Sequence, residues 1–107
     1  MTPRLKTSIW VQATLRAGVN GVVVHKGDPD AGGVLVVLRG RPGLAVFSRI
    51  TGADGEPAWL RAVGAEPLTE AEADAYVARQ TGRDPDLWVI EMEAADLVLP
   101  FEGRIVA

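Results

Sequence analysis

Cysteine is absent from the 107 residues of this chain. Its absence excludes disulfide bonds, thiolate metal ligands and a cysteine nucleophile, and it suits a reducing compartment. The sequence also has no apolar run near the ~20 residues that a membrane-spanning helix needs, and its first residues do not have the pattern of a signal peptide. We therefore expect a cytoplasmic protein with no membrane partner.

Histidine is almost absent as well, since His25 is the only one. A lone histidine cannot build a metal site with two or three histidine ligands. The glycine-bearing segments 27–33 and 40–43 do not have the sequence of a phosphate-binding loop, and no calcium-binding loop of the EF-hand type occurs. The sequence therefore predicts no metal site and no cofactor, and it assigns no catalytic residue.

The composition is that of a globular chain, with 48% apolar and 23% charged residues. Its length fits a single domain over residues 1–107. Charge is unevenly placed, because residues 1–63 carry eight basic and four acidic side chains and residues 64–107 carry three and ten. Such an asymmetry can mark a binding face. We favour the simpler interpretation that the two halves neutralise each other on the folded surface, because the basic residues are scattered.

Short apolar, β-branched segments separated by turns predict strands at residues 22–26, 34–39, 44–50, 58–63 and 87–93. The first four follow one another closely and predict an antiparallel meander. The runs Val22–Val24 and Val34–Leu38 are apolar at consecutive positions. We therefore expect both of these strands to be covered on both faces.

One helix is well marked at residues 69–82. Thr69 and Glu72 have the spacing of a capping box, and Gly82 is expected to end the helix in a left-handed conformation. Its mostly apolar face combines residues 73, 76, 77 and 80. Residues 7–17 are ambiguous, because their apolar residues fit both the period of a strand and the spacing of a helix.

Several segments together carry a resemblance to a known family. They are Ile9-Trp10-Val11, the turn with Gly27-Asp28 and Ala31-Gly32, the helix from Glu70 to Arg79, and the block Asp84-Pro85-Asp86-Leu87-Trp88. Over roughly residues 4–93 the chain resembles the small bacterial family known as domain of unknown function 1491. The block from Asp84 to Trp88 is the most specific part, and the connection after Arg16 is shorter than in the family.

The resemblance implies no catalytic residues, because the family has no established activity. It favours a helix for residues 8–17, and a helix before a bent meander is also similar to the Sm-like layout. We therefore expect an α+β fold with an N-terminal helix, about five short antiparallel strands in a strongly bent sheet, and a second helix inserted before the last strand.

Acidic residues near the end of the chain are interpreted as structural. Pro85 disfavours a helical conformation at Asp84, and Asp86 can bond to nearby amides, which is typical of a helix-to-strand connector. The alternative is a cation or substrate site that combines both aspartates with Asp28. Glu91 and Glu93 would point to the same side of a strand, about 7 Å apart, opposite an apolar face of Trp88, Ile90 and Met92.

The tryptophans Trp10, Trp59 and Trp88 are half of the six aromatic residues. We expect at least two of them to close the core. The alternative is that one is exposed beside Arg39, Arg49 or Arg61 and forms a stacking platform.

These features favour a non-catalytic binding or adaptor module that acts through protein–protein contacts, including homo-oligomerisation through a sheet edge. The candidate binding residues are His25, Arg39, Arg41, Trp59, Asp84, Asp86 and Trp88. One alternative is a small hydrolytic enzyme that uses His25 with nearby aspartates. The other is an RNA-binding module with a basic patch at Arg39 and Arg41, which is not favoured because the net charge is −3.

Overall fold

The computed structural model describes residues 7–30, 32–51, 57–64, 66–99 and 104–106. Its elements in chain order are α1 (Thr7–Ala17), β1 (Val19–His25), β2 (Val34–Gly40), β3 (Gly43–Thr51), β4 (Pro57–Ala62), α2 (Glu70–Arg83), β5 (Trp88–Glu93) and β6 (Arg104–Val106). The helix that the family resemblance favoured near the N-terminus is confirmed as α1. Neither helix of the described part is long and apolar enough to cross a membrane.

The strands form one mixed sheet in the order β1-β5-β2-β3-β4-β6. β2, β3 and β4 are consecutive and antiparallel, as predicted. β5 is inserted between β1 and β2, antiparallel to the first and parallel to the second, and β6 pairs in parallel with β4. The α+β fold with a helix before the last main strand is confirmed, whereas the purely antiparallel order is wrong and the Sm-like layout is not confirmed.

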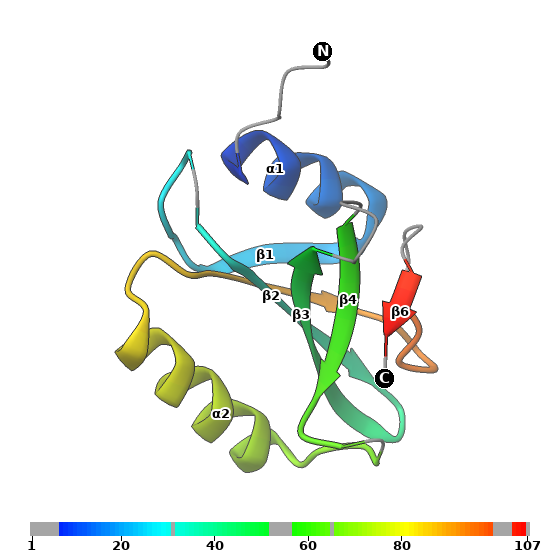
Figure 1. The fold of residues 1–107 in the computed structure, drawn as a ribbon. Helices are drawn as coiled ribbons and strands as arrows, with labels where there is room; N and C mark the ends of the chain where they lie inside the picture. Colours follow the sequence, from blue (N-terminus) through cyan, green and yellow to red (C-terminus); the bar gives the residue numbers. More distant parts are fainter. Residues whose placement is uncertain (1–6, 31, 52–56, 65, 100–103, 107) are drawn as a thin grey trace.

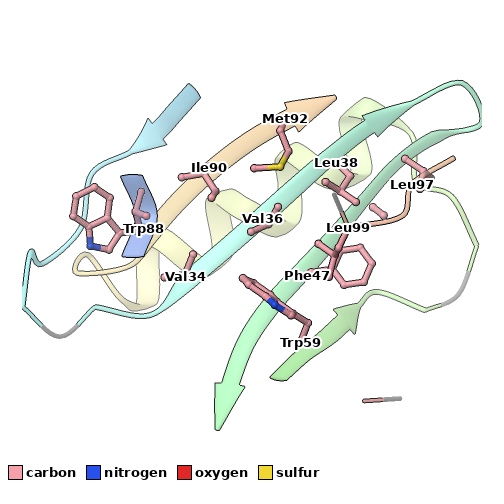
Figure 2. Packing of buried hydrophobic residues seen from close by; sticks show 12 residues of the cluster. Val34, Val36, Leu38, Phe47, Trp59, Trp88, Ile90, Met92, Leu97 and Leu99 are labelled. Atoms are coloured by element: carbon pink, nitrogen blue, oxygen red, sulfur yellow. The ribbon is translucent and has the colours of Figure 1, made fainter. Parts of the chain in front are cut away.

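Both faces of the central strands are buried, and consecutive residues belong to different cores. Val36 of β2 and Ile90 of β5 lie in a core on the α1 side, beside Trp88 and Met92 (Figure 2). Their neighbours Val37 and Val89 lie in a second core on the α2 side. The two helices therefore cover opposite faces of one sheet (Figure 1), which explains why the run Val34–Leu38 of β2 is apolar at consecutive positions.

The two valine-rich runs have opposite environments. Val34–Leu38 is buried on both faces, as expected. The same expectation is wrong for Val22–Val24, whose residues are 53%, 42% and 55% exposed. β1 is an edge strand of the sheet, so fewer elements lie beside it than beside β2.

α2 begins as its sequence predicts. The Thr69 hydroxyl accepts a hydrogen bond from the Glu72 amide at 3.1 Å, and the Thr69 amide donates to the Glu72 carboxylate at 2.9 Å. The predicted stop at Gly82 is wrong, because the helix continues through Arg83. Asp84 is extended instead, as expected for a residue before proline.

Candidate functional site

The two segments that carry most of the family resemblance are bonded to each other. We call residues 25–30, 32–33 and 84–88 the loop junction. The Asp28 amide donates to the Asp86 carbonyl at 3.0 Å, and the Trp88 indole N–H donates to the Asp28 carbonyl at 2.7 Å. The Trp88 amide donates to the Gly33 carbonyl at 2.8 Å. The loop junction therefore ties the end of β1 and the start of β2 to the start of β5.

Two glycines make this close approach feasible. A side chain at Gly27 or Gly32 would overlap the Asp86 carbonyl oxygen and crowd the Trp88 ring. Glycine has no Cβ, so only this residue lets the two backbones meet here without displacement.

Four of the predicted binding residues, His25, Asp84, Asp86 and Trp88, lie in the loop junction. The His25 Nδ1 atom lies 2.7 Å from the Leu87 carbonyl, and it must donate because a carbonyl oxygen only accepts. The Asp84 carboxylate accepts from the Asp86 amide at 3.1 Å.

The Asp28 carboxylate has a similar local role, since it accepts from the Asp30 amide at 2.9 Å. These are turn contacts of the kind predicted for Asp84-Pro85-Asp86. No group of three or more histidine, aspartate or glutamate residues in the described part of the chain could hold a metal ion. The contacts of His25, Asp28 and Asp84 thus stabilise backbone and do not support the hydrolytic hypothesis.

The two tryptophans among the candidate binding residues are in the core. Trp59 is 2% exposed and Trp88 is 5% exposed, and both pack in the cluster on the α1 side (Figure 2). Neither ring has a free face for stacking, which confirms the prediction that at least two tryptophans close the core. The side chain of Trp10 lies outside the described part.

Arg39 lies in a cluster of charges with Glu70 and Glu91. Its Nη1 and Nη2 atoms donate to the two Glu70 carboxylate oxygens at 2.7 and 2.9 Å. Its Nε and Nη2 atoms donate to Glu91 Oε1 at 2.9 and 2.7 Å. The hydrogen bonds from Arg39 lower the pKa of Glu70 below its usual value, and the hydrogen bonds that Arg39 donates to Glu70 and Glu91 raise the pKa of Arg39.

This cluster bears on the charge asymmetry of the chain. Arg39 comes from the basic half and both carboxylates come from the acidic half, so the two halves meet and neutralise each other here. Arg41, the second cation of the suggested RNA patch, is exposed in the turn after β2. The hypothesis of an RNA-binding patch is weakened, because the charge of Arg39 is already paired with two carboxylates.

The exposed apolar surface is concentrated on β1. Seven large apolar side chains are exposed in the described part of the chain, and four belong to this strand: Val19, Val22, Val23 and Val24. The strand is at the end of the sheet order and has no described partner on its outer side. We call this strand, with its unpaired outer side, the β1 edge.

Grooves flank the β1 edge on both faces of the sheet. One, of about 290 Å³, is lined by Val11 and Leu15 of α1 together with Val23. The other, of about 170 Å³, includes Val24 of β1 and Val77 of α2, and Arg39 and Glu91 are among the residues that line it. Val23 and Val24 therefore point into opposite grooves, as successive residues of a strand do.

Comparison with known proteins identifies the family. The model of DUF1491, described as a protein of unknown function, matches residues 5–102. The chain belongs to the DUF1491 family. No curated protein matches this chain.

Solved structures support the assignment. A DUF1491 family protein from Caulobacter crescentus CB15, solved by crystallography, is 37% identical, with a TM-score of 0.84, and the match covers 96% of this chain and 100% of that one. An NMR structure of a DUF1491 family protein from the same organism gives 35% identity, a TM-score of 0.82 and coverages of 99% and 100%. Protein Atu0922 from A. tumefaciens shares the fold, at 22% identity, a TM-score of 0.78 and 98% coverage of both chains.

The loop junction joins two of the segments that carry the resemblance to the DUF1491 family. The Gly27-Asp28 turn and the block from Asp84 to Trp88 are separate in the sequence, and they form one hydrogen-bonded unit in the fold. Sequence reasoning missed the pairing of Arg39 with Glu70 and Glu91, which are 31 and 52 residues away. It also missed the exposure of β1, for which the sequence holds no signal that we identify.

Proposed function

We propose that this DUF1491 chain is a non-catalytic binding module that acts through protein–protein contacts at the β1 edge. The observation that carries the proposal is the exposure of Val19, Val22, Val23 and Val24 on a strand that has no outer partner among the described residues. An unpaired strand offers backbone N–H and C=O groups to an extended segment of another chain. Affinity in such strand addition comes from the main chain, and side-chain pockets add specificity.

The flanking grooves fit this mode of binding. A strand added beside β1 would place its alternate side chains toward the α1 groove and the α2 groove. The predicted residues of the loop junction then act indirectly, because His25 and Trp88 hold the end of β1 on the sheet. The absence of cysteine supports a cytoplasmic location for this contact.

The test is affinity capture from the native host with the wild-type chain and two lysine variants. Val24→Lys places a charge on the β1 edge, whereas Val98→Lys places the same charge on a residue that is 65% exposed outside the strands. We expect a protein bound by the wild type to be retained by Val98→Lys and lost with Val24→Lys. Equal retention by both folded variants would contradict the proposal.

A further inference from the structure

We infer that the occupant of the β1 edge is a second copy of this chain, paired antiparallel with Val23 on the two-fold axis. The inference rests on the proposed function and adds the identity and register of the partner. A two-fold interface uses the same patch on both subunits, so the patch must be complementary to itself. The β1 edge meets this condition in its apolar residues and in its charges.

The apolar residues are self-complementary in one register. In the register centred on Val23, Val23 lies opposite Val23 of the second copy. Val22 of each copy then lies opposite Val24 of the other copy. Pairing about Val22 would instead set Val24 against Asn20 and Val23 against Gly21. Directly opposed β-branched side chains stabilise a sheet, and the register about Val23 opposes Val22, Val23 and Val24, three of the four exposed valines of β1, to valines.

The charges at the two ends of the strand are complementary in the same register. No residue of β1 is acidic or basic apart from His25 at its end, so no like charges meet in the centre. The register sets Asn20 against Lys26 of the second copy. The Asn20 amide group donates to the Glu93 carboxylate at 2.9 Å, so this carboxylate lies where the exposed Lys26 would arrive.

The geometry of β1 indicates a weak dimer. Its pairing with β5 is irregular between Val19 and Val22 and again between Val23 and His25. Such irregularities bend a strand and limit edge pairing. The regular stretch around Val22–Val23 is therefore short, and we expect the dimer to dissociate on dilution.

Charge variants at the axis test the register. In a dimer centred on Val23, Val23→Lys brings two lysines together and Val23→Glu brings two glutamates together. Sedimentation velocity should show self-association of each variant weakened at least tenfold relative to the wild type. An equimolar mixture of the two should associate again, because each lysine then opposes a glutamate. A mixture that stays monomeric while the wild type dimerises would overturn the register.

A cross-link tests the same contact independently. The chain has no cysteine, so Val23→Cys introduces the only thiol, and residues directly opposed in an antiparallel pair have Cβ atoms about 5 Å apart. Under mild oxidation we expect a disulfide-linked dimer to form at least tenfold faster with Val23→Cys than with the exposed control Val98→Cys.

The outcomes separate this inference from the proposed function. Equal cross-linking rates, with a wild type that is monomeric from micromolar to millimolar concentration, would overturn the second copy as occupant. The proposed function would still stand if Val24→Lys lost a captured protein of another kind. It would fail if Val24→Lys and Val98→Lys retained the same proteins.

Discussion

The runs Val22–Val24 and Val34–Leu38 consist only of valine and leucine, yet they lie in opposite environments. The second run is buried on both faces, because β5 and β3 flank it and both helices cover the sheet there. The first run lies on the edge strand and is largely exposed. The difference arises from the order of strands in the sheet and not from the residues themselves.

This contrast separates two uses of the same side chain. A valine in the centre of the sheet stabilises the fold by burial. Three adjacent exposed valines leave apolar area uncovered beside an unpaired backbone, which is typical of a contact surface. Substitutions in Val34–Leu38 should therefore change the free energy of unfolding. Substitutions in Val22–Val24 should instead change association with a partner.

The largest expected effect on stability is in the centre of the sheet. Ile90 is fully buried between β1 and β2, and Ile90→Ala should lower the free energy of unfolding by about 2–5 kcal/mol through lost burial and a cavity. Urea unfolding measures the change. Val23→Ala on the edge should change it by less than about 0.5 kcal/mol. Equal losses for the two variants would mean that β1 is as covered as β5.

The loop junction should tolerate no side chain at Gly27. Gly27→Ala should destabilise the chain by about 1–3 kcal/mol, since the new methyl group overlaps the Asp86 carbonyl and displaces it. Gly82→Ala is the matched control, because Gly82 lies in α2 with no atom near the position of a Cβ. That substitution should stabilise the helix by about 0.5–1 kcal/mol. Thermal unfolding of the two variants should shift in opposite directions.

Valine-to-threonine substitutions compare the two runs at nearly constant shape. Val36 is fully buried and Val24 is 55% exposed. Val36→Thr should cost about 1–2 kcal/mol, because a hydroxyl enters an apolar core. Val24→Thr should leave unfolding unchanged within about 0.5 kcal/mol. A measurable loss of stability for Val24→Thr in the monomer would contradict the exposed position of β1.

The smallest effect concerns pH and the charge cluster beside the β1 edge. The pKa of Glu70 is lowered in the folded state, mainly by its hydrogen bonds with Arg39. Its stabilising contribution is therefore present above its unfolded pKa and is lost as pH falls through the folded value. Unfolding followed from neutral to acidic pH should show a shallower loss of stability below about pH 4.5 for Glu70→Gln than for the wild type. Asp74→Gln is a control on the same helix. An identical acid dependence for Glu70→Gln and the wild type would contradict the stabilising role of the pair of Glu70 with Arg39.

Local features were predictable from the sequence because their causes are close along the chain. The capping box of α2 needs only Thr69 and Glu72, and the β2–β3–β4 meander needs only short turns between apolar segments. Gly82 predicts the wrong end for α2, because the helix continues through Arg83. Pro85 ends the helix instead, by forcing Asp84 into an extended conformation.

Long-range features were not predictable from single segments. The insertion of β5 between β1 and β2 joins residues about 50–70 positions apart, and no local pattern encodes that pairing. The exposure of β1 and the ion pair of Arg39 with Glu91 both follow from it. The candidate residues of the loop junction were found by their turn chemistry, but their role in holding β1 to β5 depends on the same insertion.

The most direct test of the account is the set of backbone amide chemical shifts recorded while the protein is diluted from millimolar to micromolar concentration. The account predicts progressive changes at Val22–Val24 and their neighbours in β1, with constant shifts at Val34–Leu38. Constant shifts along β1, with changes confined to another surface, would contradict the claim that the β1 edge is where two copies of this protein meet.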